Sequence, residues 1–287
     1  WTTSTRQALQ FCQQVGSLQP NLRRDQLMEN NLFMDLWSGL SRRRLWMALA
    51  VEQLRANYQH SMLGLIWIGI GFSCFAGVKI VIFGSISDQN AAFFTSWLLS
   101  GFLAWMLISS FITKACNVFI SSKSWINGVQ MPFSVFVFKS IWEEMIKTVF
   151  NLIAAIAIII IFGHFSWIGM TFALFAIPLF VLTAIPLFII LGILCAYNRD
   201  LLQLVQTFMR ILFFATPIIW IPRPDTVTQL VADANPLSYF LMLFREPLTE
   251  GTLPIKAVLV WAVITVFLWV VAALIFKNQR NTIIYWI

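Results

Sequence analysis

The sequence predicts an all-α polytopic membrane protein with six transmembrane helices, an N-terminal amphipathic interfacial helix and two short external re-entrant helices. The first observation is composition: 59% of the 287 residues are apolar and 11% are charged, whereas soluble domains are about 45–50% apolar. The second is that apolar runs of about 20 residues, the length that crosses a bilayer as a helix, recur six times. The third is that no run alternates as a barrel strand does. Together these observations exclude a soluble globular protein.

The predicted spans are residues 64–86, 91–112, about 139–162, 171–195, 201–221 and 257–276. Each must be helical, because backbone groups in hydrocarbon have no water to bind. Glu143 and Lys147 lie four residues apart in the third span, which predicts an ion pair on one helix face. Pro178 and Pro186 are predicted to kink or interrupt the fourth span. Lys79, in the outer half of the first span, is expected to snorkel.

Basic residues outside the spans are unevenly divided between the two sides of the membrane. One side has seven in the N-terminal tail, three between the second and third spans, one between the fourth and fifth, and two after the last. The other side has three, all in the last loop. Because Lys and Arg favour the cytoplasmic side, both termini are predicted to be cytoplasmic.

This layout predicts three segments. They are a cytoplasmic tail over residues 1–40, a transmembrane domain over residues 41–280 and a second cytoplasmic tail over residues 281–287. The four cysteines are far apart in the sequence, which argues against a disulfide framework or a zinc site.

An amphipathic helix is predicted from Arg42 to Tyr58, because apolar residues recur there at helical spacing. The apolar stripe comprises Trp46, Leu49, Ala50, Leu54 and Tyr58. The basic residues of the segment are Arg42, Arg43, Arg44 and Arg55. Such a helix is expected to lie in the cytoplasmic membrane interface. Two roles stay open for its cations, an anchor on anionic lipid or a contact with the substrate.

The last external loop, residues 222–256, is long enough to contain structure of its own. Asp225 is predicted to cap a short helix that ends at Val231. Asn235 and Pro236 have the cap and first-turn chemistry that starts a second helix. We expect both helices to dip back at the outer membrane face.

The sequence contains no motif for catalysis. It has no phosphate-binding GxxxxGK[ST] loop, no nucleophile elbow and no HExxH pair. The chain is therefore predicted not to hydrolyse ATP by itself. The two histidines, His60 and His164, are expected to be interfacial residues.

Arg210 is the strongest functional candidate within a span, because a charge at the membrane centre costs about 2.5–3.5 kcal/mol even on insertion scales. Gln203, Gln206 and Thr207 share its helix face, which continues into Phe213 and Phe214. This face is expected to meet a partner helix or a water-filled path, and both interpretations stay open. Tryptophans at span ends, such as Trp67, are expected to be membrane anchors.

Four short motifs follow one another along the chain. The first, residues 54–67, reads LRANYQHSMLGLIW, and the second is Pro132, which closes the loop after the second span. The third joins YNRD at 197–200 with ATPII at 215–219, and the fourth joins NPL at 235–237 with Arg245. From about residue 42 to residue 280, their order and spacing resemble type-2 ABC exporter permeases for polysaccharide, including O-antigen, capsule and teichoic acid exporters. Asn57, Gln59 and Asn127-Gly128 depart from that pattern, where the family often has basic residues.

The resemblance implies a homodimer of multi-pass permeases in the bacterial inner membrane. Two copies of a separate ABC ATPase subunit would dock on the cytoplasmic side and bind ATP and Mg. No cofactor or metal is expected in this chain, and no nucleic acid as a partner. The implied substrate is a polyprenyl-pyrophosphate-linked glycan. O-antigen, which is used in lipopolysaccharide biosynthesis, is preferred over capsule polysaccharide and teichoic acid.

The resemblance also implies roles for individual residues. The amphipathic helix would be a cytoplasmic gate where the pyrophosphate enters, with the residues Arg42, Arg43, Arg44, Arg55 and Tyr58. The first and fifth spans would line a channel, with the candidates Trp67, Gln203, Gln206, Arg210, Phe213 and Phe214. Coupling to the ATPase would involve Ser124, Trp125 and Pro132 in the segment 113–132, together with Arg199 and Asp200. External helices would close the channel, with the residues Asn235, Pro236, Tyr239, Phe240 and Arg245.

The sequence leaves two alternatives to polysaccharide export. A small-molecule or drug exporter of the same type would need a closed apolar cavity in place of a continuous channel. A membrane glycosyltransferase or ligase would need acidic catalytic residues at the outer face, where Asp225, Asp233, Glu246 and Glu250 lie. No metal-ligand spacing links these four, which disfavours the enzyme.

Overall fold

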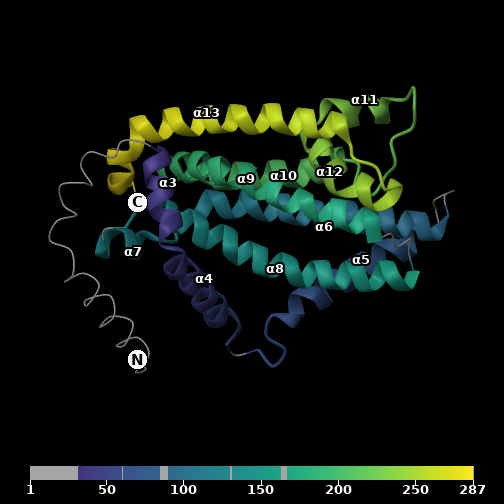
Figure 1. Ribbon diagram of the computed structural model, residues 1–287, viewed down its shortest axis with the longest axis horizontal. Helices are drawn as coiled ribbons and strands as arrows, with labels where there is room; N and C mark the ends of the chain where they lie inside the picture. The colour runs from purple at the N-terminus through teal and green to yellow at the C-terminus, as the bar shows by residue number, and fades with distance from the viewer. Residues whose placement is uncertain (1–31, 60, 85–89, 130, 163–166, 287) are drawn as a thin grey trace.

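The computed structural model describes residues 32–59, 61–84, 90–129, 131–162 and 167–286, and their regular secondary structure is entirely helical. Four of the helices are long and apolar enough to cross a membrane: α6 (Ala91–Asn117), α8 (Phe133–Phe162), α9 (Trp167–Tyr197) and α13 (Ile255–Trp286). They run along the long axis of the molecule (Figure 1). The predicted all-helical membrane fold is therefore confirmed in its class, and the count of six spans stays a prediction.

Two further apolar helices are shorter. Helix α5 (Ile66–Gly84) has 19 residues and α10 (Asp200–Ala215) has 16. The sequence predicted a helical span to residue 221 for the second of these, but the helix ends at Ala215. Pro217 disfavours the helical conformation of Thr216, which is extended with φ −97° and ψ 138°. Residues 216–221 consequently leave the helix.

Helix α9 is continuous from Trp167 to Tyr197, with Pro178 and Pro186 inside it. Of the two predicted effects of these prolines, an interruption is wrong and a kink stays a prediction. Each proline removes one backbone donor, and the remaining hydrogen bonds of the turns on either side hold the helix together. Its packing against α6 and α13 supports the same conformation.

Helix α6 lies at the centre of the bundle and packs against α5, α8, α9, α10 and α12 (Pro236–Glu250). The pair predicted in α8 is confirmed, since Lys147 Nζ lies 3.2 Å from Glu143 Oε1. The sequence analysis missed two further members of this cluster. Lys114 of α6 lies 3.0 Å from Glu143, and Lys147 lies 2.8 Å from Glu144. Glu143 therefore links α6 to α8.

The short helices gather at opposite ends of the bundle (Figure 1). Helix α3 (Leu32–Ser41), α7 (Lys123–Gly128) and the C-terminus lie at one end, with α4 (Arg43–Tyr58) angled away from α3. We call this the basic end, after the arginines of α4. Helices α11 (Val227–Ala234) and α12 lie at the opposite end, which we call the distal end. Helix α3 was not predicted, and it packs against α8 and α13.

A buried carboxylate attaches α3 to the bundle. Asp35 Oδ2 accepts a hydrogen bond from the backbone N–H of Ser134 at 2.9 Å, and the Ser134 hydroxyl donates to the Asp35 carbonyl at 2.6 Å. Gly39 lies against Ser134, so a larger residue would collide with that side chain. This contact fixes α3 on the first turn of α8.

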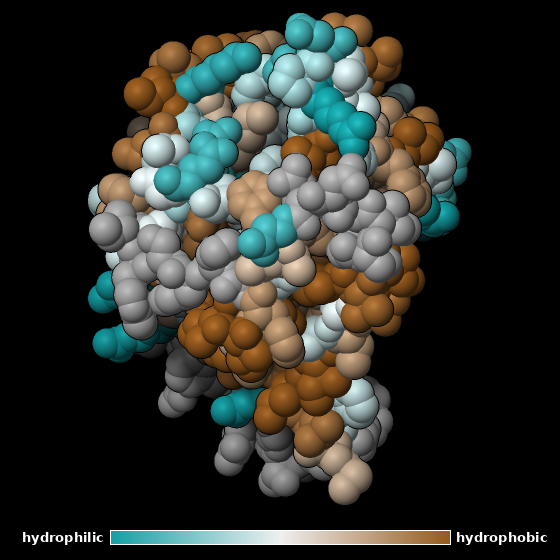
Figure 2. All heavy atoms as spheres, turned by 90° about the vertical axis from the view of Figure 1, so that its right-hand side faces the viewer, coloured by the Kyte–Doolittle hydropathy of each residue, from teal (hydrophilic) through white to brown (hydrophobic). Residues whose placement is uncertain are grey.

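The distal end is polar in part. Figure 2 shows it face-on, with hydrophilic side chains gathered at the top of the view, where Figure 1 places α11 and α12. Apolar side chains cover much of the lower part. Both kinds of surface therefore meet at this end of the bundle.

Candidate functional site

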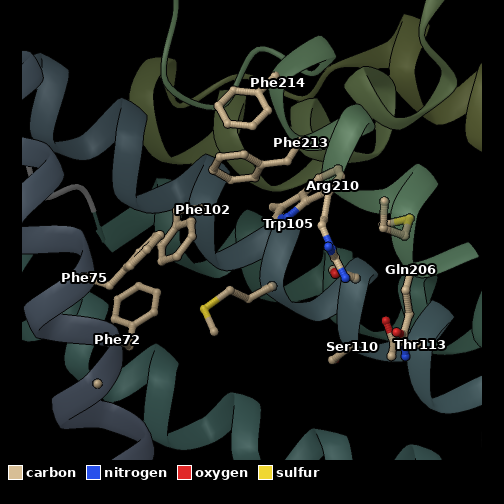
Figure 3. A pocket seen from close by; sticks show the side chains of 14 residues that line it. Phe72, Phe75, Phe102, Trp105, Ser110, Thr113, Gln206, Arg210, Phe213 and Phe214 are labelled. Carbon is tan, nitrogen blue, oxygen red and sulfur yellow. The ribbon is translucent and has the colours of Figure 1, made fainter. Parts of the chain in front are cut away.

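Helices α5, α6 and α10 form an open groove with a volume of about 900 Å³ (Figure 3). Its lining is mainly aromatic at one end and polar at the other. We call it the aromatic groove. It is lined by Gly71, Phe72, Phe75, Phe102, Trp105, Met106, Ser109, Ser110, Thr113, Gln206, Met209, Arg210, Phe213 and Phe214.

Five phenylalanines and one tryptophan are among the residues that line the groove. Phe102 stacks on Phe75 and Phe72, with ring centroids 4.8 Å and 5.5 Å away. Across the groove, Phe213 meets Trp105 edge-on at 5.7 Å. Phe75 and Phe214 are 48% and 73% exposed in the single chain. Phe72, Phe102 and Trp105 are at most 6% exposed, so the aromatic side chains that the wall presents to an occupant are Phe75, Phe213 and Phe214.

The polar end is formed by Ser110 and Thr113 of α6 with Gln206 of α10. In Figure 3 the Arg210 side chain lies between these residues and the phenylalanines. Hydroxyl and amide groups can donate and accept hydrogen bonds, and the guanidinium only donates. The groove can thus hold a ligand with an apolar face and several hydroxyl or anionic groups.

A second cation stands over the aromatic wall. Lys79 Nζ lies 4.6 Å from the centroid of Phe75 and 5.0 Å from that of Phe213. Ammonium groups at this distance are attracted by the ring quadrupole. The expectation of simple snorkelling is therefore incomplete, because Lys79 also contacts two residues that line the groove.

The structure brings together four of the six predicted channel residues. Gln206, Arg210, Phe213 and Phe214 all line the aromatic groove. Trp67 and Gln203 are exposed and do not line it. The sequence did not predict the following lining residues from α5 and α6: Phe72, Phe75, Phe102, Ser110 and Thr113. No spacing in the sequence could have found them, because they meet α10 only through helix packing.

The predicted amphipathic helix corresponds to α4, and its apolar stripe packs against α8. Ala50 and Leu54 are buried, and Trp46 contacts the rings of Phe138 and Trp142 of α8. The cations Arg43, Arg44 and Arg55 are exposed, while Arg42 and Tyr58 at the ends of the helix are partly buried. The apolar face thus meets protein, and the basic face is exposed to lipid or substrate.

The predicted coupling residues gather at the basic end. Ser124 and Trp125 are exposed on α7, and Pro132 directly precedes α8. Arg199 and Asp200 are exposed where α9 passes into α10. Gly192 near the end of α9 lies against Val118 and Phe119 just beyond α6. This contact brings the α9–α10 junction to the same end as α7.

The predicted external helices are α11 and α12. Thr226 and not Asp225 precedes α11, which ends at Ala234, so the predicted cap and end are wrong. Asp225 instead adopts positive φ, 59°, a conformation that short Asp side chains tolerate in turns. Asn235 caps α12 as predicted, since its side chain accepts the N–H of Leu237 at 3.0 Å and Pro236 occupies the first turn.

Side chains of α12 are fixed by contacts with other elements. The Tyr239 hydroxyl donates to the Asp233 carbonyl at 3.1 Å, and the Phe240 ring stacks on Phe180 at 6.2 Å. Arg245 is 2% exposed, with its guanidinium carbon 3.9 Å above the centroid of Trp97. Burial lowers the pKa of Arg245 to about 9, so the side chain is still charged at neutral pH.

Similar proteins are known from two bacteria. The O-antigen export system permease protein RfbA of Klebsiella pneumoniae is 23% identical over 245 residues, which cover 82% of this chain and 92% of that protein. The protein of the same name from Myxococcus xanthus is 22% identical over 248 residues, covering 83% and 94%. A further Klebsiella pneumoniae protein of that name is 23% identical over 245 residues, covering 82% and 92%. No family model matches the chain.

Proposed function

We propose that this chain is the transmembrane permease subunit of a type-2 ABC exporter that moves lipid-linked polysaccharide out of the cytoplasm. Among such polysaccharides, O-antigen is the first candidate. The alignment with three O-antigen export permeases extends over more than four fifths of the chain. The long apolar helices are those of a multi-pass membrane protein. A permease subunit transports its substrate and leaves it chemically unchanged.

In this proposal six helices cross the membrane: α5, α6, α8, α9, α10 and α13. Helix α10 is about 24 Å long at 1.5 Å per residue, so residues 216–221 complete its crossing. The basic end faces the cytoplasm, because arginines accumulate on that side. Helices α11 and α12 are then external and close the path from outside.

The observation that carries the proposal is the aromatic groove. Aromatic faces pack against the C–H faces of sugar rings, and the contact tolerates sliding. A long polymer needs many weak contacts of this kind, because one deep binding site would hold it in place. The groove is open in the single chain, so a second copy facing it would enclose a continuous path.

A separate ATPase supplies the energy in this proposal, since the sequence has no phosphate-binding loop. It docks on α7 and the α9–α10 junction, both exposed at the basic end. The pyrophosphate of the substrate enters at the basic face of α4, where Arg43, Arg44 and Arg55 attract it.

Depletion of this protein in its native cells tests the proposed function. The expected result is accumulation of lipid-linked glycan inside the cells and loss of surface glycan, both restored by re-expression of the chain. Unchanged surface glycan would contradict the proposal. If small toxic compounds accumulated instead, the chain would be a small-molecule exporter.

A further inference from the structure

The aromatic groove contains positive charge without acidic residues. Among its lining residues Arg210 is the only charged one, and Lys79 stands over two of its rings. Arg210 precedes Phe213 by three residues on α10, and in Figure 3 its guanidinium is directed toward the polar end of the groove, away from the Phe213 ring. The groove therefore has one cation over its aromatic wall and a second toward its polar end.

The helices that build the groove supply no counter-ion there. Helices α5 and α6 contain no Asp or Glu, and α10 contains only Asp200. Asp200 is ten residues from Arg210, or about 15 Å along the helix. Among the described residues, no carboxylate lies within 4 Å of Arg210 or Lys79, whereas Lys114 and Lys147 both have acidic partners.

A second copy of the chain does not remove this imbalance. A copy that presents the same three helices to the groove adds another Lys79 and another Arg210, with its Asp200 again at the end of α10. Burying unpaired cations is unfavourable. An anionic group on the molecule that passes through the enclosed path would balance these charges.

We propose that Lys79 and Arg210 make the aromatic groove selective for an anionic substrate, one that brings carboxylate or phosphate groups past the aromatic wall. The inference rests on the proposed function and narrows its substrate class. The planar guanidinium of Arg210 binds both anions through paired hydrogen bonds. Two parts of the substrate can supply the anion: an acidic sugar in the glycan repeat, or the pyrophosphate of the lipid anchor.

The test uses two host strains that make glycans of equal length on the same polyprenyl pyrophosphate. One glycan carries a uronate in each repeat, and the other carries the neutral hexose. Each strain lacks its own permease and receives this chain with its ATPase partner, as wild type or as the Lys79→Gln/Arg210→Gln variant. Surface glycan is measured per amount of permease in the membrane.

With wild type, surface glycan is expected in at least the uronate strain. For the double variant we expect about tenfold less export, the loss expected when charged hydrogen bonds are removed. Loss for the uronate glycan alone assigns the anion to the sugar, and equal loss for both glycans assigns it to the anchor. Export of both glycans at the wild-type rate by the variant would overturn the inference.

Two control variants separate selectivity from folding. Lys277→Gln removes an exposed cation of α13 far from the groove and is expected to export both glycans normally. Arg210→Lys with native Lys79 retains both charges and is expected to keep most of the export. If cells with the wild-type permease showed neither glycan at the surface, the proposed function itself would be contradicted. Normal export by the double variant would contradict only the selectivity for anions, so the two failures can be told apart.

Discussion

Glu143 is the residue on which the interior charges of the bundle depend. It is 1% exposed, and its Oε1 atom forms ion pairs with Lys114 Nζ at 3.0 Å and Lys147 Nζ at 3.2 Å. Breaking a buried ion pair from one side is costly, because the remaining charge stays desolvated. The cluster thus joins α6 to α8. Its carboxylate is paired with lysines of the cluster and does not pair with the cations of the aromatic groove.

Replacement Glu143→Gln is expected to lower stability by about 2 kcal/mol, less than for a fully buried pair because both lysines are partly exposed. The measurement is the thermal denaturation midpoint of the purified protein in detergent. Glu52→Gln is the matched control. Its pair with Arg55 is exposed on both sides, so the midpoint should stay unchanged. Equal effects of the two variants would show that the Glu143 cluster is not stabilising.

Gly101 has no side chain, and this leaves room for the buried guanidinium of Arg245. A Cβ atom at this position would collide with the guanidinium of Arg245, which is held over Trp97. Gly101→Ala is expected to cost about 1–3 kcal/mol in stability, the range for overpacked interiors. Gly77→Ala, where a Cβ atom meets nothing within 4 Å, should be neutral or stabilising, since Ala favours helices. A stable Gly101→Ala protein in the same denaturation assay would contradict this packing.

At the scale of elements, Asn235 joins α12 to the end of α10. Its side chain accepts the N–H of Leu237 at 3.0 Å, and its amide donates to the Thr216 hydroxyl at 2.8 Å. Asn235→Ala is expected to lose about 2 kcal/mol, about half from the cap and half from the second hydrogen bond. Asn235→Asp keeps the cap acceptor and loses the amide donor, so it should lose about half as much. A wild-type midpoint for Asn235→Asp would contradict a separate contribution from Thr216, and equal midpoints for the two variants would contradict a separate contribution from the cap.

Helix α7 supplies the second prediction at this scale. Trp125 is 38% exposed on a helix of six residues at the basic end. An exposed tryptophan at this end can contact another subunit. Trp125→Ala is expected to abolish most surface glycan while the permease stays at its normal level in the membrane. Leu253→Ala, an exposed position near the distal end, is the control and should leave export intact. Normal export by Trp125→Ala would remove α7 from the proposed coupling.

Local signals in the sequence predicted some elements well. The cap and proline at Asn235 and Pro236 fixed the start of α12, and periodicity found α4. The face of α10 was found because residues three and four apart share a side of a helix. The end of α10 was missed because apolarity continues to residue 221 although Pro217 stops the helix. Helix α3 was missed because its fixing contact, from Asp35 to Ser134, joins residues 99 apart in sequence.

At the scale of the whole molecule, the groove is where prediction from sequence was most limited. One wall could be predicted, because Gln206, Arg210, Phe213 and Phe214 are close along α10. The facing wall comes from α5 and α6, and its composition depends on how three helices pack. The position of Lys79 over Phe213 depends on the same packing. The charge imbalance of the groove could therefore be recognised only in three dimensions.

The central claim is that glycan passes along the aromatic groove, and photo-crosslinking inside cells tests it most directly. A photoreactive phenylalanine analogue replaces Phe214 in the groove or, as control, Phe267 on α13, both strongly exposed in the single chain. Cells that make the glycan are irradiated while the ATPase partner is inactive and the substrate is held in transit. Our account predicts that glycan is attached to the permease at position 214 and not at position 267. Attachment at neither position, or equally at both, would contradict it.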